Sequence, residues 1–428
     1  MSSPSSCTMA SLRRLSWILV CLAVLAPRAP ARADALDHWT PQSIVTNVLQ
    51  YGFRDLTFGN GRYVVVGDAP CTSDYGTVVT SEDGFNWTVR RNGCADGLSE
   101  LLGVVYAQGK FVAVGYMGMI YSSTNGIYWD LRQQAPFYNF SGVAYGNGTF
   151  VAVGDGFLQT GGTTSNNIYG SIDGVTWTAR RSGPAGSVSA PIYAVAYGNG
   201  TFVAVGSDNA NAGIAYRSTT GSTWARTSIP VPFGWSSRLS YVNGLFLVPM
   251  GIGTNLVSSD GSIWSVQTND SAAYISRMVF TRGLYIGMAS HDAGSVGDYH
   301  MVTSTNGTNW STHGTLPPTY GPTPFTIGDR RIVAVGQQQV SSYGWSCQLF
   351  TSDPLLDLAI SPGFPPQLQV SGLVGATYYL QYVTNPVVTP SNLWQTLSTF
   401  TLTNSPATIS DPQAPAASPR YYRAFLLR

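Results

Sequence analysis

Residues 145–177 read YGNGTFVAVG, then a variable segment, then NIYGSIDGVTW. Asn147-Gly148 lies between two apolar runs, and Asn-Gly favours positive φ at both turn centres, so it predicts a tight β-hairpin. The run 150–154 (FVAVG) is apolar throughout and predicts a strand buried on both faces. Asp173-Gly174 predicts a second hairpin, and Trp177 opens an outgoing strand. The stretch therefore predicts four antiparallel strands, a to d, with tight a–b and c–d turns and a variable b–c loop.

This stretch recurs along most of the chain. Seven a–b copies can be aligned: FGNGRYVVVG (58–67), YAQGKFVAVG (106–115), YGNGTFVAVG (145–154 and 197–206), YVNGLFLVPMG (241–251), FTRGLYIGMAS (280–290) and IGDRRIVAVG (327–336). Six c–d copies follow the pattern S-x-(D/N/T)-G-x-x-W and end at Trp87, Trp129, Trp177, Trp224, Trp264 and Trp310. A four-stranded unit with a period near 45 residues is typical of a β-propeller.

The seventh c–d copy is incomplete, and its tryptophan is found at the other end of the chain. It begins at residues 352–354 (SDP), and no tryptophan follows. Trp39 precedes Gly61 by 22 positions, which is also the spacing from Trp87 to Gly109. The N-terminal segment is therefore predicted to supply strand d of a last unit whose strands a to c come from residues 324–352. The prediction is an all-β, seven-bladed propeller closed by strand exchange, which removes free sheet edges. A linear array leaves Trp39 unexplained.

The c–d pattern resembles the Asp-box (BNR) repeat of sialidases and of other secreted or luminal propellers, including the photosystem II assembly factor family. The resemblance covers residues 34–357 and implies the blade structure, with one residue fewer before the aromatic than is usual. In the box at 171–177, for example, Ser171 and Asp173 can bond backbone N–H groups across the turn, and Trp177 can pack between blades. A structural role is therefore expected for the box residues Asp83, Asp173, Asp260, Trp39, Trp87, Trp129, Trp177, Trp224, Trp264 and Trp310. Ligand or metal binding by the box aspartates is the alternative.

Composition limits the function further. Charged residues make up 10% of the chain and the net charge is +1, which argues against nucleic-acid binding because such proteins need a basic surface. Lys110 is the single lysine, and Glu82 and Glu100 are the only glutamates. No cofactor is expected.

The N-terminus has the features of a cleavable signal peptide spanning residues 1–33. Arg13 and Arg14 precede an apolar run at 15–26, and Ala31-Arg32-Ala33 is a small-x-small cleavage site. Twelve apolar residues are too few to span a bilayer, so the alternative of a membrane anchor is weaker. Export to the periplasm, the cell surface or the medium is expected, by the general or the twin-arginine route, with the propeller at 34–361. Oligomeric state is left open.

Beyond residue 361 the repeat stops. The segment PGFPPQ predicts a linker, and residues 362–428 contain short strands without Asn-Gly or Asp-Gly turns. This part resembles a C-terminal β-sandwich module of exported bacterial proteins, with a role in attachment, sorting or spacing.

Export permits disulfides, and three cysteines would remain after cleavage. Cys71 in the first b–c loop and Cys94 in the next d–a loop would lie on the same face, which makes them a candidate pair. Cys347 would then be a free thiol.

Because the tight turns share one face of a propeller, the long b–c and d–a connections share the other, where function is expected. One position of strand a, six residues before the a–b turn glycine, differs among the copies in a way that indicates a site. It holds Asp55, Gly103, Gly142, Ala194, Arg238 and Arg277 in copies one to six, and Arg54 stands beside the first. Small residues suit the crowded centre. Buried arginine needs a partner, so the two arginines either pair with Asp55 or a loop carboxylate, or bind an anionic ligand.

Other loop residues are weaker candidates for ligand contact. Asp68 and Asp155 follow strand b, and Tyr299 and Trp345 are loop aromatics suited to stacking on a sugar or peptide, although such residues also cover one another. His291 and His300 flank Asp292 and Asp298, but the spacing matches no metal motif, and no metal site is expected.

The sialidase resemblance implies three converging arginines, a tyrosine activated by glutamate, and an aspartic acid. Arg54, Arg238 and Arg277 can fill the first role, and only Glu100 can serve the tyrosine. The predicted function is therefore an exported, non-catalytic propeller that binds a protein or a carbohydrate through its loop face. A sialidase-like glycoside hydrolase is one alternative, and a structural envelope component is the other.

Overall fold

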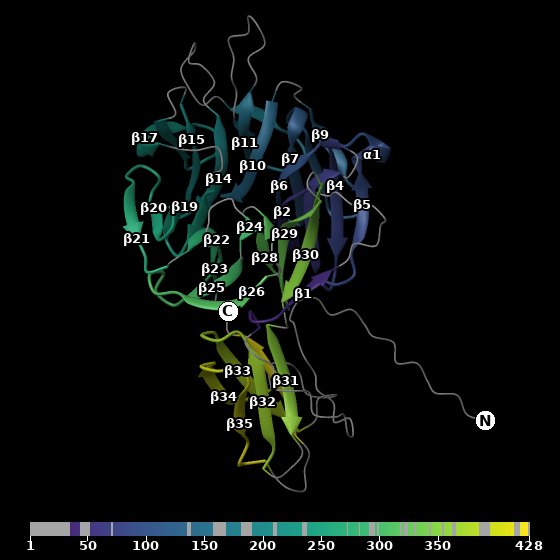
Figure 1. Ribbon diagram of the computed structural model, residues 1–428, viewed down its shortest axis with the longest axis vertical. Coiled ribbons are helices and arrows are strands. Elements are labelled where there is room, and N and C mark those ends of the chain that lie inside the picture. Colours follow the sequence, from purple (N-terminus) through teal and green to yellow (C-terminus); the bar gives the residue numbers. More distant parts are fainter. Residues whose placement is uncertain are drawn as a thin grey trace, which may run out of the picture. The chain divides into compact units, whose positions relative to one another are not determined.

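The chain forms two compact units, residues 33–355 and 356–427, that are almost entirely β-structure (Figure 1). The computed structural model describes residues 35–42, 52–69, 72–134, 138–156, 168–180, 191–208, 212–232, 238–271, 273–281, 283–290, 296–297, 299–316, 319–320, 324–328, 331–341, 344–352, 355–361, 365–384, 394–414 and 420–426. Within these ranges no helix is long and apolar enough to cross a membrane.

Six four-stranded antiparallel sheets follow one another through the described part of the first unit. The first three contain β2 (Gly52–Gly59), β3 (Arg62–Ala69), β4 (Thr72–Ser81) and β5 (Thr88–Asn92); β6 (Leu101–Ala107), β7 (Lys110–Gly115), β8 (Ile120–Ser123) and β9 (Asp130–Gln133); and β10 (Tyr138–Gly146), β11 (Thr149–Gly156), β12 (Ile168–Ser171) and β13 (Thr178–Arg180). The next three contain β14 (Ile192–Gly198), β15 (Thr201–Ser207), β16 (Ala212–Ser218) and β17 (Ala225–Pro232); β18 (Ser240–Val242), β19 (Leu245–Gly251), β20 (Thr254–Ser258) and β21 (Ser265–Thr268); and β22 (Tyr274–Thr281), β23 (Leu284–Ser290), β25 (His300–Ser304) and β26 (Ser311–Thr315). Two short helical turns, α1 (Gly93–Asp96) and the 3-10 turn η1 (Tyr116–Gly118), lie in connections.

The a–b turns are the tight hairpins that the sequence predicted. Asn147 and Gly148 have φ of 42° and 74°, the pair of positive values that a two-residue turn of this kind requires. The same pair of positive φ values recurs at residues 60–61, 108–109, 199–200 and 243–244.

The c–d connection is wider than the two-residue hairpin predicted for it. Between β12 and β13 it runs from Ile172 to Trp177, and only Gly174 has positive φ. Asp173 closes this wider turn because its Oδ1 accepts the backbone N–H groups of Val175 and Thr176, both at 2.8 Å. Those hydrogen bonds lower the pKa of Asp173 to about 2.

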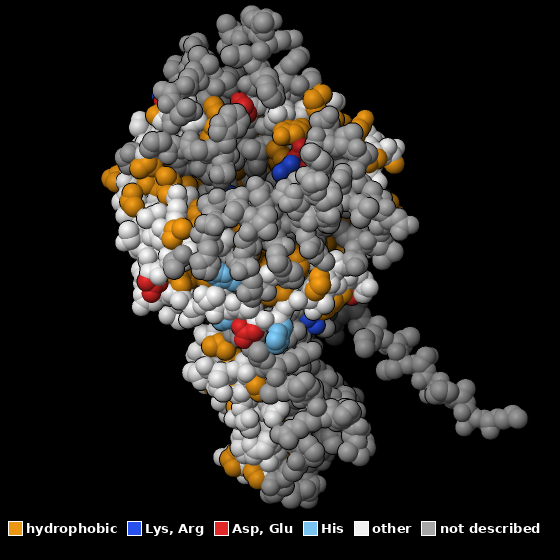
Figure 2. Space-filling model, viewed as in Figure 1, with side chains coloured by type: hydrophobic (Ala, Val, Ile, Leu, Met, Phe, Trp, Pro, Cys, Tyr) orange, Lys and Arg blue, Asp and Glu red, His pale blue; other side chains and the backbone are white. Residues whose placement is uncertain are grey.

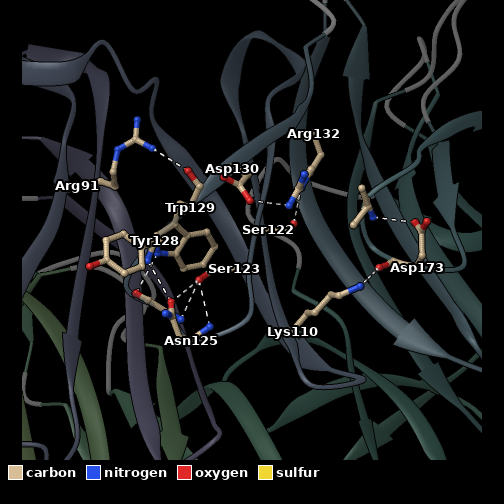
Figure 3. A network of polar contacts seen from close by, with 12 residues as sticks. Arg91, Lys110, Ser122, Ser123, Asn125, Tyr128, Trp129, Asp130, Arg132 and Asp173 are labelled. Atoms are coloured by element: carbon tan, nitrogen blue, oxygen red, sulfur yellow. Dashed lines mark hydrogen bonds and ion pairs between the residues drawn. The ribbon is translucent and has the colours of Figure 1, made fainter.

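In the second sheet an asparagine side chain closes the c–d turn in the same way, as Figure 3 shows. Asn125 Oδ1 accepts from the backbone N–H groups of Ile127 and Tyr128, and the Ser123 hydroxyl accepts from Gly126. A side-chain oxygen at this position is therefore sufficient for the turn. This agrees with the structural role predicted for the box residues.

Several box tryptophans close the turn with a hydrogen bond, and box tryptophan rings pack in the core between sheets. The indole N–H of Trp129 donates to the carbonyl oxygen of Gly126, three residues earlier, and the corresponding bond is made by Trp87, Trp224 and Trp264. Trp177 packs with Phe150 of its own sheet and with Val112 and Val114 of the preceding one. Truncating such a buried tryptophan costs about 3 kcal/mol or more.

The N-terminal segment completes a further sheet. Strand β1 (Trp39–Gln42) pairs with β30 (Gly344–Ser352), with Trp39 opposite Ser352. Strand β30 pairs with β29 (Ile332–Ser341), and β29 pairs in turn with β28 (Phe325–Ile327). The Trp39 indole donates to Leu36 O at 2.9 Å, again three residues earlier. Trp39 therefore takes the place of the missing box tryptophan, as its spacing predicted.

The same sheet has two strands that the sequence did not indicate. Strands β24 (Val296–Gly297) and β27 (Thr319–Tyr320) pair with each other, and β27 pairs with β29 opposite Gln337. One comes from the b–c connection of the preceding sheet, so a loop that varies among the copies contributes to regular structure here.

The sheets are arranged around a common centre (Figure 1). The inner strands β2, β6, β10, β14, β18 and β22 contact one another in succession, and β2 also contacts β28. Apolar side chains fill the layers between successive sheets. This is the architecture of a β-propeller.

The second unit contains two three-stranded sheets that share one core. One sheet has the order β31 (Leu356–Ser361), β32 (Gln367–Gly372), β35 (Ala407–Ser410), and the other β34 (Gln395–Thr401), β33 (Thr377–Val383), β36 (Tyr421–Leu426). Leu358 and Val370 from the first sheet and Leu380 and Tyr422 from the second lie in the same apolar cluster.

This unit begins earlier than the boundary at residue 362 that the sequence suggested. β31 pairs along its whole length with β32, from Leu356 opposite Gly372 to Ser361 opposite Gln367. The proline-rich segment interpreted as a linker therefore joins two paired strands of one sheet.

Candidate ligand site at the loop end of the inner strands

Five of the inner strands of the first unit have a β-bulge near the end at which they begin, here called the loop end. The pairing shifts by one residue between Phe53 and Asp55 in β2, and equivalent shifts occur in β6, β10, β14 and β22. A bulge leaves one residue unpaired and redirects the side chains around it. The position after the bulge is the one that the sequence singled out.

On one side of the centre this position is small because the backbones approach closely. A Cβ built on Gly103 would lie 3.4 Å from the Cα of Gly142, and one built on Gly142 would lie 3.8 Å from the Cα of Ala194. A Cβ at either glycine would therefore make ordinary van der Waals contact with the next inner strand, so the backbones lie close together but leave room for a methyl group.

On the other side the position is charged. Asp55 Oδ1 accepts from Arg277 Nη1 at 2.9 Å, and Asp55 Oδ2 accepts the backbone N–H of Val104 at 3.1 Å. Figure 1 shows β24 and β28 between β22 and β2, so this ion pair joins two sheets that are not neighbours. Of the two alternatives for Arg277, pairing with Asp55 is observed.

Arg238 lies beside this pair, just before β18, and is partly accessible to solvent. Within the described ranges it makes no hydrogen bond or ion pair. Burial, followed by the positive charge of Arg277, lowers the pKa of Arg238, while Asp55 and the hydroxyls of Tyr274 and Tyr299 act in the opposite direction. Among the described residues, two guanidinium groups therefore share one carboxylate, and one positive charge is left over.

Tyr274, at the start of β22, is a residue of this site that the sequence analysis missed. Burial raises the pKa of Tyr274, and Arg238 beside it opposes that shift. No hydrogen bond of its hydroxyl is found in the part of the chain that the structure describes. The only sequence signal for Tyr274 was its place three residues before Arg277. This spacing indicates a shared site only when the bulge between Ile275 and Arg277 is known.

Arg54, the extra residue of the first bulge, turns to a different pair of groups. Its Nε donates to Glu100 Oε1 at 2.9 Å and to Asp68 Oδ1 at 3.1 Å, and Nη2 donates to Asp68 Oδ2 at 2.9 Å. Glu100 is 2% exposed and Asp68 9%. Burial, and a hydrogen bond with Asp68, raise the pKa of Glu100 to about 8.

These charged groups are concentrated in a protein whose surface is otherwise poor in charge. Figure 2 shows few acidic or basic groups on the face that it presents. Arg54, Asp55 and Arg277 lie near the start of strand a, Arg238 and Glu100 lie just before it, and Asp68 lies near the end of strand b. The loop end is therefore where the tertiary structure gathers charge.

The remaining candidate residues are Asp155, Trp345 and Tyr299. Asp155 lies in β11 opposite Asn139, and Trp345 lies in β30 opposite Gln339. Tyr299 is 1% exposed. It is therefore a core residue near Arg238 and does not offer a ring face for stacking.

The cysteine and metal predictions are only partly covered by the described residues. Cys94 lies in α1 and is disulfide-bonded. Its predicted partner Cys71 lies outside the described ranges, as do His291, Asp292 and Asp298, so the pairing stays a prediction. Among the residues that the structure describes, no three His, Cys, Asp or Glu side chains are placed to hold a metal ion.

The chain is similar in structure to several solved proteins at low sequence identity. They include "YCF48 bound to D1 peptide" (17% identity, TM-score 0.49, 77% of this chain and 99% of that one), the WD40 β-propeller domain of Doa1 (12%, 0.45, 75% and 97%) and U3-55K (9%, 0.47, 75% and 100%). No protein-family model matches the chain, and no curated protein matches it. These similarities assign no ligand or activity to this protein.

Proposed function

We propose that the protein is an exported, non-catalytic, seven-bladed β-propeller, closed by its N-terminal strand, that binds a protein or glycan partner at the loop end. Arg238, with Arg277 and Tyr274, is the anion-binding centre of that surface. The second unit is a β-sandwich module. The disulfide at Cys94 and the apolar run at 15–26 support export.

The observation that carries the proposal is the charge left over at Arg238. A partly buried guanidinium beside another cation is unfavourable unless an anion compensates it. Among the described residues no carboxylate pairs with Arg238, because Asp55 is bonded to Arg277 and Val104. A ligand with one negative charge would neutralise the cluster, and the hydroxyl of Tyr274 can donate a further hydrogen bond to it.

A sialidase-like hydrolase is less well supported by the same geometry. Arg54 is occupied by Asp68 and Glu100, so it is not available as a third substrate arginine. Glu100 is bonded to Arg54 rather than placed to activate a tyrosine. A screen with fluorogenic sialosides that gave turnover above the blank would revive this alternative.

Binding of acidic and neutral ligands to wild type and to Arg238→Gln tests the proposal. Suitable probes are sialylated and uronic-acid oligosaccharides, their neutral counterparts, and peptides with free or amidated carboxyl ends, which separate the glycan and protein sources of the anion. Because Arg238→Gln removes a charge-assisted contact, the affinity for acidic probes should fall by about tenfold or more, and the affinity for neutral probes should not change.

Arg132→Gln is the matched control, because Arg132 lies on the outer strand β9 and is paired with Asp130. It should bind as wild type does. Equal affinity of wild type and Arg238→Gln for every acidic probe would refute an anion-binding role for Arg238.

A further inference from the structure

We propose that Glu100 and Asp68 share one proton beneath Arg54, and that release of this proton opens the contact between the first and second sheets at the loop end. The contact is then most stable in acidic solution, loses this stabilisation as the pH rises through neutral, and is weakest in alkaline solution. Its functional consequence rests on the function proposed above, since the opened contact would also disturb the anion site.

The charges at this contact do not balance without a proton. Two carboxylates, both nearly buried, face one guanidinium, and that guanidinium is bonded to both of them. A second buried negative charge is costly when its one counter-ion is already shared, so one carboxyl group keeps its proton. The raised pKa of Glu100 agrees with this assignment.

No other charged group faces this pair in the described structure. On β2, Asp55 is turned to Arg277. In the segment before Glu100, Asp96 pairs with Arg91. The other titratable groups nearby are two tyrosines: Tyr75 on β4, which pairs with Ser99, and Tyr116 of η1, whose backbone N–H bonds the Glu100 carbonyl oxygen.

The contact holds two sheets together. Arg54 and Asp68 belong to β2 and β3 of the first sheet, and Glu100 immediately precedes β6 of the second. Loss of the proton would place two negative charges side by side in a buried position, and separation of the sheets would let water reach them.

Arg54 also links this contact to the anion site. It is the bulged residue directly before Asp55, and Asp55 holds both Arg277 and the backbone N–H of Val104 in the second sheet. A change in the position of Arg54 therefore acts on Asp55, the one carboxylate among the described residues that balances the two arginines. Alkaline solution should weaken ligand binding there.

Hydrogen exchange of the ligand-free mature chain, measured by mass spectrometry as a function of pH and corrected for intrinsic rates, tests the proton-operated contact directly. The folded state keeps a proton that the opened state loses. The proton therefore stabilises the contact fully below the ordinary pKa of glutamate, and this stabilisation is lost as the pH rises towards about 8, the raised pKa of Glu100. Protection of peptides covering 98–104 should fall by up to about tenfold per pH unit in that window and then level off.

Glu100→Gln keeps the hydrogen-bonding capacity of the protonated acid and cannot lose a proton, so its protection should not depend on pH. Glu82→Gln is the matched control, because Glu82 is the other glutamate and its side chain is 72% exposed. It should behave as wild type does. If Glu100→Gln does not fold, Asp68→Asn provides the test. It leaves one carboxylate opposite Arg54, which needs no shared proton, so the pH dependence of protection should vanish.

Wild-type protection that is flat across this pH range, or a slope that persists in Glu100→Gln or Asp68→Asn, would overturn the proposal. A chain that shows the slope and binds no acidic probe would overturn the proposed function and leave the proton-operated contact standing. The two failures are therefore distinguishable.

Discussion

At the residue scale, two arginines at equivalent positions of neighbouring sheets have different surroundings. Arg277 is paired with Asp55 at 2.9 Å. Arg238 has that pair beside it and no carboxylate of its own in the described ranges. A residue placed at such a cost to stability is typical of a binding site, since the ligand provides the missing charge.

Replacing Arg238 should therefore separate stability from binding. Arg238→Gln removes the repulsion with Arg277, so the free energy of unfolding of the ligand-free protein should rise by about 0.5–1 kcal/mol while the affinity for acidic probes falls. Chemical denaturation at low ionic strength measures the change. Arg277→Gln, which leaves Asp55 without its partner, should destabilise the protein instead. If Arg238→Gln instead lowered the free energy of unfolding by about 0.5–1 kcal/mol, Arg238 would have a structural partner.

At the scale of the element, the inner strands are fitted to one another by glycine and tyrosine. A Cβ built on Gly146, the last residue of β10, would lie 2.0 Å from the Cγ of Tyr197 in β14. The same contact occurs between Gly59 and Tyr106. The glycine before an a–b turn and the tyrosine of the next copy therefore set the spacing between neighbouring sheets, which the hairpin alone does not explain.

Gly146→Ala should destabilise the protein by about 1–3 kcal/mol, because the added methyl group overlaps the tyrosine ring. Most of this loss should disappear when the substitution is made in a Tyr197→Ala background, as a double-mutant cycle by thermal or chemical unfolding would measure. Gly148→Ala is the comparison: nothing lies within 4 Å of its Cβ, so its cost comes from a φ of +74° alone and should not depend on Tyr197. Additive losses for Gly146 and Tyr197 would contradict the contact.

At the scale of the whole molecule, the two ends of the first unit meet in one sheet. Strand β1 has only four residues, yet it covers the edge of β30 and brings Trp39 to the position that a box tryptophan occupies elsewhere. An uncovered edge strand invites association with other chains. The N-terminal segment therefore contributes to stability and to solubility.

Trp39→Ala should cost about as much as Trp129→Ala, about 3 kcal/mol each, because both indoles make the same bond to a carbonyl three residues earlier. Thermal unfolding of the mature chain provides the comparison, and size-exclusion chromatography shows whether the opened edge causes association. A Trp39→Ala protein as stable as wild type would show that the N-terminal strand does not close the propeller.

Local physics made much of this fold predictable from sequence. Asn147-Gly148 dictates a hairpin because few other dipeptides accept two positive φ values, and Asp173 dictates the box turn through its own hydrogen bonds. The spacing of Trp39 was enough to indicate closure. Strand β31 has no turn signal of its own and is defined by its pairing with β32, so the local sequence does not mark where the second unit begins.

For the candidate site, the sequence by itself determined which positions depart from the repeat, and so marked Arg54, Asp55, Arg238 and Arg277. Only the tertiary structure decided how they divide: Arg277 with Asp55, Arg54 with Asp68 and Glu100, and Arg238 with no carboxylate in the described ranges. Repeats are local, and each blade's strands and turns can be inferred from its own residues. Charge balance at the loop end joins residues up to 222 positions apart, and it depends on the closed ring that brings them together.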